Sequence, residues 1–120
     1  MSFDDSRPIW IQLAENFGQK IVSGEWEPGS KIPSVRELAL EQGANPNTIQ
    51  RALSKLDDDG LTVPERAQGR FVTGDETVIQ RRREEIAVAQ TDRHIVALQG
   101  LGLTLDGAVK LLRQRWITSN

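Results

Sequence analysis

The 120-residue sequence contains no cysteine and only one histidine, His94. Without thiols there can be no disulfide framework and no thiolate metal site, and a single histidine cannot build a metal centre from imidazole ligands. We therefore expect no metal and no cofactor, and we interpret His94 as an ordinary surface or interface residue. The sequence also has no nucleophile–base pair and no glycine-rich phosphate loop, so we expect no catalytic residues and no enzyme activity.

Long apolar segments are also missing. No apolar run approaches the roughly 18 residues that are needed to cross a bilayer. The acidic N-terminal segment MSFDDSRPIW lacks the apolar stretch of a signal peptide. These absences predict a soluble, cytoplasmic protein that makes no membrane contact.

Positive charge is not in excess. The chain has 15 lysines and arginines against 17 aspartates and glutamates, a net charge of −2. Residues 1–73 hold 8 basic and 11 acidic residues, and residues 74–120 hold 7 and 6. Because nucleic-acid-binding domains are usually basic overall, any contact with nucleic acid must use a local basic patch.

The first half of the chain shows patterns typical of three helices. Residues 8–23 place apolar side chains on one helical stripe, namely Trp10, Leu13, Phe17 and Ile21. Ser34 begins a second helix with a capping-box pattern that includes Glu37, and Gly43 ends that helix. Asn45 is the expected N-cap of a third helix, with Pro46 at its first position.

The third helix has two distinct faces, because successive side chains are rotated by 100°. One face is apolar and carries Ile49, Ala52, Leu53 and Leu56. The other face is polar and carries Asn47, Gln50, Arg51, Ser54 and Lys55, with Thr48 at its margin. Two short helices joined by a tight turn predict a helix-turn-helix. The segment LTVPERAQGRFVT then predicts two strands, 61–64 and 70–73, which would form a hairpin wing.

The remaining residues predict two further helices. No glycine or proline occurs from Asp75 to Gln99, and the apolar residues of this segment lie on several sides, which indicates more than one neighbour. Thr104 is expected to cap a last helix with a regular apolar stripe of Leu105, Ala108, Val109, Leu112 and Trp116. We interpret Arg81–Glu85 (RRREE) as a charged helix surface with internal ion pairs, although a DNA-contacting patch is the alternative.

The segments KIPSVRELALEQGANPNTIQRALSKLDDDGL and QGRFVTG together resemble the GntR family of transcriptional regulators. The resemblance covers residues 7–74. It implies a mainly α fold with a small β-hairpin, namely a winged helix-turn-helix. Residues 34–56 would form the helix-turn-helix, and residues 61–73 would form the wing. Residues 75–120 have room for only two helices, which resembles the YtrA-type subfamily, as does the NPNT turn at Asn45–Thr48.

The resemblance also implies how such a protein works. Members of this subfamily are described as homodimeric repressors, often of transporter operons. Residues 1–74 would bind double-stranded operator DNA, and residues 75–120 would form a helical dimerisation tail. Two helices alone cannot enclose the roughly 300 Å³ of a small-molecule site. An unidentified effector would therefore have to lodge between the tail and the winged helix.

We expect the polar face of the third helix to carry the base contacts. Asparagine can form two hydrogen bonds with adenine, and arginine can do so with guanine, so Asn47 and Arg51 are the candidates. Thr48 and Lys55 are expected to contact phosphates. The helix N-terminus at Asn45 would offer backbone N–H groups to another phosphate. The alternative is a polar face that is merely solvated.

Arg36 lies in the first turn of the second helix, where a cation opposes the helix dipole. The family's arginine at this position reaches DNA, and a phosphate or guanine would explain its presence here. A surface ion pair with Glu37 or Glu41 is the alternative. Ser34 is first a helix cap and only secondarily a DNA contact.

In the wing, Gly69 would let the backbone approach the minor groove, where Arg70 would gain from the negative potential. The wing departs from the family pattern at Pro64, Glu65 and Ala67, and this lowers the contribution that we expect from it.

The favoured hypothesis is a sequence-specific DNA-binding repressor that binds an inverted-repeat operator as a homodimer. The alternative is a winged helix that acts as a protein-interaction adaptor, which the net negative charge favours.

Overall fold

The computed structural model describes residues 3–119 and forms two compact units that meet between Glu84 and Glu85. This division lies inside one long helix, whereas the sequence predicts a boundary after residue 74. The first turns of that helix belong to the first unit because they contribute to its core, where the Ile79 side chain is only 3% exposed.

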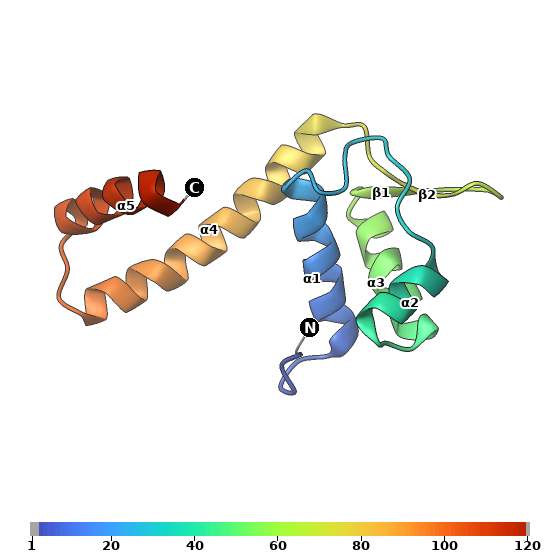
Figure 1. The fold of residues 1–120 in the computed structure, drawn as a ribbon, viewed down its shortest axis with the longest axis horizontal. Coiled ribbons are helices and arrows are strands. Elements are labelled where there is room, and N and C mark those ends of the chain that lie inside the picture. The colour runs from blue at the N-terminus through green and yellow to red at the C-terminus, as the bar shows by residue number, and fades with distance from the viewer. Residues whose placement is uncertain (1–2, 120) are drawn as a thin grey trace. The chain divides into compact units, whose positions relative to one another are not determined.

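The first unit is a three-helix core followed by a β-hairpin and the beginning of the long helix (Figure 1). Its elements are α1 (Ile9–Val22), α2 (Val35–Gln42), α3 (Pro46–Asp58), β1 (Thr62–Glu65), β2 (Gly69–Val72) and the start of α4 (Glu76–Gly100). This arrangement confirms the predicted winged helix-turn-helix. The antiparallel strands pair Thr62 with Val72 and Glu65 with Gly69, so each strand is displaced by one residue from its predicted bounds.

The hydrophobic core lies where α1 and α2 pack against α3. All four residues predicted on the apolar face of α3 are buried, which confirms the orientation of this helix. Leu13, Phe17 and Ile21 of α1 are also buried, but Trp10 at the start of the predicted stripe is only half-buried. Trp10 therefore remains accessible on the surface beside α3.

The turn between α2 and α3 is fixed by side-chain caps that the sequence predicted. The Glu37 backbone N–H donates to Ser34 Oγ, and the Ser34 N–H donates to Glu37 Oε1, both at 3.1 Å. Gly43 ends α2 in the left-handed conformation with φ of 62°. The Asn47 N–H donates to Asn45 Oδ1 at 2.8 Å and so begins α3. These caps set the angle at which α3 leaves α2.

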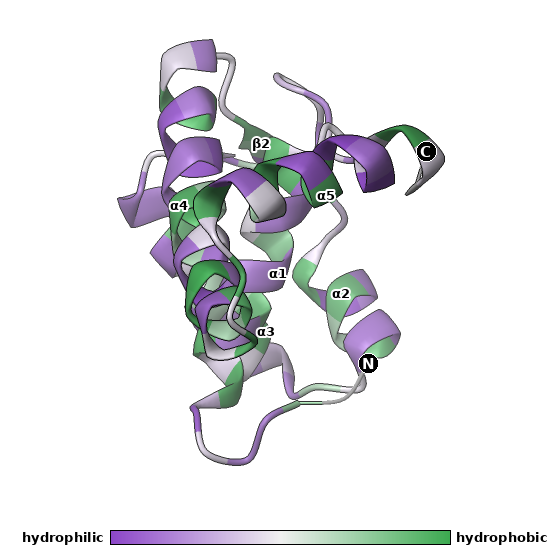
Figure 2. Ribbon diagram, turned by 90° about the vertical axis from the view of Figure 1, so that its left-hand side faces the viewer, coloured by the Kyte–Doolittle hydropathy of each residue, from purple (hydrophilic) through white to green (hydrophobic). Residues whose placement is uncertain are grey.

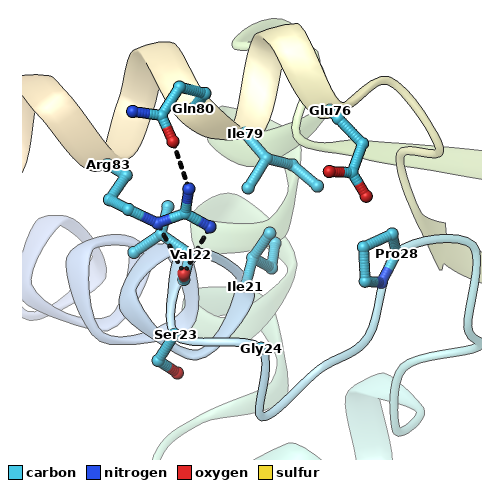
Figure 3. Close-up of a pocket in the computed structure, with 9 residues that line it drawn as sticks. All are labelled: Ile21, Val22, Ser23, Gly24, Pro28, Glu76, Ile79, Gln80 and Arg83. Carbon is cyan, nitrogen blue, oxygen red and sulfur yellow. Dashed lines mark hydrogen bonds between the residues drawn. The ribbon is translucent and has the colours of Figure 1, made fainter.

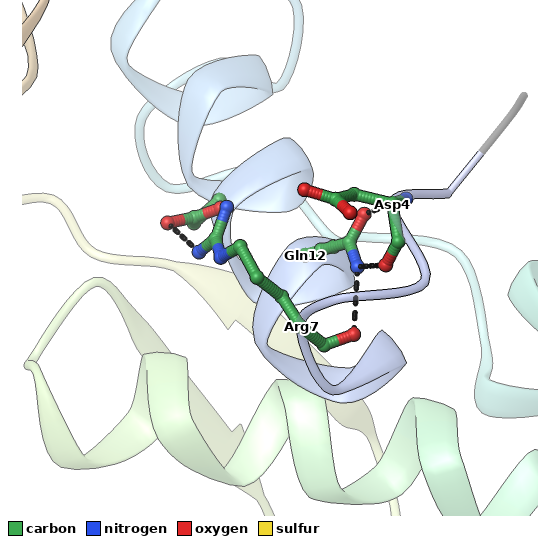
Figure 4. Close-up of polar contacts among 4 residues, drawn as sticks. Asp4, Arg7 and Gln12 are labelled. Atoms are coloured by element: carbon green, nitrogen blue, oxygen red, sulfur yellow. Dashed lines mark hydrogen bonds and ion pairs between the residues drawn. The ribbon is translucent and has the colours of Figure 1, made fainter.

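A buried glutamine holds the segment before α1 against that helix (Figure 4). Gln12 Nε2 donates to the carbonyl oxygens of Asp4 at 2.6 Å and Arg7 at 2.9 Å, while the Asp4 N–H donates to Gln12 Oε1 at 2.7 Å. Arg7 also forms an ion pair with Glu15 at 2.7 Å. The start of α1 is thereby held in place from its preceding loop.

The first turns of α4 are bonded to the core of the first unit. Arg82 forms an ion pair with Asp59 at 3.0 Å. Arg83 donates from Nε and Nη2 to the Val22 carbonyl oxygen at 3.0 and 2.9 Å, and it also bonds Gln80 (Figure 3). The Arg83–Gln80 bond is an internal contact of the kind that the sequence predicted for this charged helix surface. The sequence did not predict that two arginines of this run also bond α1 and the end of α3.

A small cavity lies between the end of α1 and the start of α4 (Figure 3). Its volume is about 170 Å³, and its walls include Ile21, Pro28, Ile79 and Arg83. This volume is well below the roughly 300 Å³ at which small-molecule sites begin.

The second unit contains the remainder of α4 and α5 (Leu105–Ser119). The Gly107 N–H donates to Thr104 Oγ1 at 3.2 Å, which confirms Thr104 as the cap of α5. The two helices are bent by 118° at the break between them. No single helix in residues 3–119 combines the length and apolar character that a membrane span requires, and α4 and α5 satisfy that test only when taken together.

Large apolar side chains of the second unit remain exposed. The predicted stripe of α5 is helical as expected, yet Leu105 is 79% exposed and Trp116 is 67% exposed. The other exposed apolar residues of this unit are Val88, Ile95, Val96, Leu101, Val109, Leu111, Leu112 and Ile117. Figure 2 shows hydrophobic segments in green along both helices. The unit does not cover its own apolar surface.

Candidate nucleic-acid interface

The exposed face of α3 carries amide, hydroxyl and basic side chains, as the sequence predicted. Asn47, Gln50, Arg51 and Lys55 are exposed, and Thr48 is half-buried at the margin of this face. The opposite face is anchored in the core. The polar side chains are therefore presented on a helix that is held firmly in place.

Arg51 is the cation of this face that contacts an aromatic ring. Its guanidinium carbon lies 4.3 Å from the centre of the Trp10 ring on α1. Within residues 3–119, the Arg51 side chain has no hydrogen bond or ion pair. The contact with Trp10 therefore leaves the five guanidinium N–H donors available.

Lys55, by contrast, is paired with an acidic residue. Its Nζ lies 3.1 Å from Asp59 Oδ1, one turn further along α3, and the Lys55 side chain is 50% exposed. Asp59 also bonds Arg82 and is only 16% exposed. Two cations thus share this carboxylate, and Lys55 uses one of its three ammonium donors in the ion pair.

The backbone at the N-terminus of α3 is already hydrogen-bonded within the protein. Pro46 has no N–H, and the Asn47 N–H bonds the Asn45 side chain. The N–H groups of Thr48 and Ile49 both donate to the Asn45 carbonyl oxygen, at 2.9 and 3.1 Å. The unbonded N–H groups that the sequence predicted for a phosphate are thus absent from this turn, so its side chains must make any contact there.

Arg36 extends from the first turn of α2 and is exposed. In the described part of the chain, it forms neither of the alternative ion pairs with Glu37 or Glu41. Glu37 is instead used in the capping box. The hydrogen bonds from the Ser34 backbone and side chain lower the pKa of the Glu37 carboxyl below its usual value of 4.5, and nearby Lys31 lowers it further.

The wing presents a different set of residues from the one expected. Arg70 points toward α3, where its side chain is only 15% exposed and pairs with Asp57 at 2.9 Å. The Lys31 side chain passes so close to Gly69 that a Cβ atom at this position would lie 2.7 Å from Lys31 Cε. A side chain larger than that of glycine would therefore displace Lys31. Gly69 has φ of 112°, which favours glycine. The exposed cations at the wing are therefore Lys31 and, in the turn, Arg66.

Trp10, Lys31 and Asp57 are the residues of this surface that sequence reasoning missed. Each one acts on a residue that lies far away in the sequence or on another element, namely Arg51, Gly69 and Arg70. Helical periodicity describes only one element at a time. It placed Trp10 on the apolar stripe of α1 and could not show that its ring lies under the Arg51 guanidinium of α3.

A capped helix-turn-helix, a hairpin wing and an exposed polar face on the second helix define the winged-helix class of DNA-binding proteins. Comparison with known proteins agrees with this class. The family model "Bacterial regulatory proteins, gntR family" matches residues 12–72. The chain belongs to the GntR family and is a DNA-binding transcriptional regulator of the YtrA type, not an enzyme.

Relatives extend this likeness along most of the chain. The chain is 33% identical over 104 residues to the uncharacterized HTH-type transcriptional regulator YhcF of Bacillus subtilis, covering 87% of this chain and 86% of YhcF. It is 37% identical over 68 residues to the HTH-type transcriptional repressor YtrA of the same organism, covering 57% of this chain and 52% of YtrA.

A solved structure is similar over nearly the whole length. The GntR family transcriptional regulator from Listeria monocytogenes superposes with a TM-score of 0.82 at 34% identity. The match covers 93% of this chain and 98% of that one. The likeness therefore includes the helices that follow the winged helix-turn-helix as well as the DNA-binding domain.

Proposed function

We propose that this protein is a cytoplasmic repressor that binds an inverted-repeat operator as a homodimer. The observation that carries the proposal is the exposed face of α3, where Asn47 and the unpaired N–H donors of Arg51 stand on a helix anchored by its other face. A helix of this kind fits the major groove, in which such side chains contact base edges.

The candidate residues divide into those that contact DNA and those that fix the interface. Asn47 and Arg51 contact bases, while Thr48, Arg36 and Lys55 contact phosphates. Ser34 and Asn45 act through the caps that orient α2 and α3. In the wing, Gly69 lets the backbone turn toward the minor groove and leaves room for Lys31 to cross it, while Arg70 holds the strand to α3 through Asp57.

The homodimer would form through the helical tail, residues 75–120, most of which belongs to the second unit. The exposed apolar side chains of α4 and α5 support this proposal, because a partner that buried them would remove a large unfavourable contact with water. Two-fold dimers are the commonest oligomers. A two-fold dimer places two recognition helices about one DNA turn apart, which requires an inverted-repeat operator.

The repressor role is proposed from the similarity to YtrA, which is named a transcriptional repressor. Regulation of a transporter operon is proposed on the same resemblance. The cavity between α1 and α4 in the described residues has a volume of about 170 Å³, which is below the roughly 300 Å³ at which small-molecule sites begin. We therefore propose that this protein has no effector pocket of the larger kind.

Selection of DNA from a random pool by the full-length protein tests this function. We expect enrichment of one inverted repeat whose half-sites are about one helical turn apart, and binding that weakens steeply as salt rises. Sedimentation at micromolar concentration should show a dimer. A protein that enriches no sequence would instead support the adaptor alternative, and a 13.4 kDa monomer would contradict the dimer.

A further inference from the structure

We propose that Trp10 is a positioning residue that determines base specificity by holding the Arg51 guanidinium in place for a base contact. The inference rests on the proposed function, because it requires Arg51 to contact a base. Trp10 lies in the first turn of α1, outside the helix-turn-helix. It would therefore extend the specificity-determining set beyond α2 and α3.

The geometry of the pair is the first argument. The Arg51 guanidinium carbon lies 4.3 Å from the centre of the Trp10 ring, well within the roughly 6 Å of a cation–π contact. Tryptophan is the strongest of the aromatic side chains in such contacts. Trp10 is half-buried, whereas Arg51, whose guanidinium lies over the ring, is exposed.

The second argument is the contrast between Arg51 and the other cations on or beside α3. Lys55 and Arg70 are bonded to carboxylates, at 3.1 and 2.9 Å, so part of their N–H donors is already engaged and their charge is already paired. Arg51 is held by a ring, which accepts no conventional hydrogen bond. Its side chain is thus restrained while its donors stay free for the two acceptors of a guanine edge.

The third argument is that Trp10 stands on a fixed support. The segment before α1 is held by the three hydrogen bonds of Gln12, two residues after Trp10 (Figure 4). Leu13, one turn along α1, is fully buried in the core. A restrained arginine loses less conformational entropy when it binds DNA than a free one does. This gain in affinity applies only to a base whose acceptors match the restrained position of the guanidinium, so it increases specificity.

The test measures specificity rather than affinity. Full-length protein is titrated with its selected operator and with operators that carry one base-pair substitution at each position. The discrimination at a position is the Kd for the operator substituted there divided by the Kd for the selected operator. Variants are Arg51→Ala, Trp10→Leu, Trp10→Phe and the double variant Trp10→Leu/Arg51→Ala. Circular dichroism and thermal unfolding report folding.

We expect Arg51→Ala to remove discrimination at one base pair. Trp10→Leu should lower discrimination at that same base pair, roughly three- to tenfold, the range of a moderate cation–π contact. Trp10→Phe, which keeps a ring, should retain most of it and provides a variant that preserves packing. The double variant should match Arg51→Ala. A loss of folded protein lowers the apparent affinity for all operators alike and leaves the ratios unchanged.

The outcomes separate the inference from the function on which it rests. If Arg51→Ala keeps full discrimination at every position, Arg51 does not contact a base, and both its proposed role and this inference are overturned. If Arg51→Ala loses discrimination but both Trp10 variants keep it, only the inference fails. If Trp10→Leu still changes discrimination in the Arg51→Ala background, Trp10 acts independently of Arg51, which also overturns the inference.

Discussion

Asp57 and Arg70 form a two-pronged ion pair that joins the last turn of α3 to β2, the second strand of the wing. Arg70 Nε donates to Asp57 Oδ1 at 3.0 Å, and Nη2 donates to Oδ2 at 2.9 Å. Thr62 of β1 also donates to Asp57 Oδ1, at 2.6 Å. One carboxylate therefore fixes both strands of the hairpin to α3, and a planar pair of this kind is stronger than a single hydrogen bond.

Asp57→Asn should destabilise the protein by about 2 kcal/mol, because a partly buried Arg70 loses its charged acceptor. Chemical denaturation followed by circular dichroism measures this change. Asp58→Asn is the matched control, since Asp58 is exposed and a surface change of this kind costs about 0.5 kcal/mol or less. Equal stability of the two variants would show that the ion pair adds nothing.

Arg36→Ala should weaken binding to all duplexes alike if Arg36 contacts a phosphate. The slope of log K against log salt concentration should then become shallower by about one unit. Fluorescence anisotropy at several salt concentrations measures the slope, with Arg93→Ala in the second unit as the control. An unchanged slope together with an altered base preference would place Arg36 on a base instead.

The capping box should make stability depend on pH in the acid range. Because hydrogen bonds from Ser34 lower the pKa of folded Glu37 below 4.5, its charged form stabilises the fold above about pH 4.5. That contribution is lost as the pH falls through the lowered pKa. Glu37→Gln keeps an acceptor oxygen but cannot titrate. The wild-type advantage in Tm over Glu37→Gln should therefore be present at pH 7 and shrink toward pH 3, and a constant difference would contradict it.

Leu112→Glu should convert the proposed dimer to a monomer, because it places a charge in the apolar stripe of α5 that a partner would cover. Leu112 is 56% exposed in the single chain, so the substitution should leave the fold of that chain intact. Analytical ultracentrifugation measures the mass, and operator affinity should fall as the second half-site is lost. Arg113→Glu, one residue further on, is the control. A dimer that persists in Leu112→Glu would exclude this stripe from the interface.

Much of the fold could be predicted from the sequence because its signals are local. Ser34, Gly43, Asn45 and Thr104 cap or end helices through contacts with residues at most five positions away. The apolar face of α3 follows from a period that one segment contains in full. The family could also be predicted, because its motif is a run of such local signals in a fixed order.

The tertiary structure alone decided how the cations of the surface are used. Arg51, Lys55 and Arg70 look alike in the sequence, as basic residues in or beside the predicted interface. In the folded chain, Arg51 lies over the Trp10 ring. Lys55 shares Asp59 with Arg82, and Arg70 turns inward to Asp57. Trp10, Arg82 and the Asp57–Arg70 pair are brought together by packing between elements, so no periodicity within one helix could identify these contacts. The Lys55–Asp59 pair alone has the i,i+4 spacing of a local contact.

The extent of the DNA-binding unit was decided in the same way. The sequence predicted a boundary after residue 74, where the family resemblance ends and the character of the sequence changes. The compact unit nevertheless continues to Glu84, because Ile79 enters the core and Arg83 bonds the end of α1. The sequence by itself determined which segments become helices and strands, since backbone caps and side-chain periodicity act over a few residues. Only the tertiary structure decided which of those helices share a core, because burial depends on residues that are far apart in the chain.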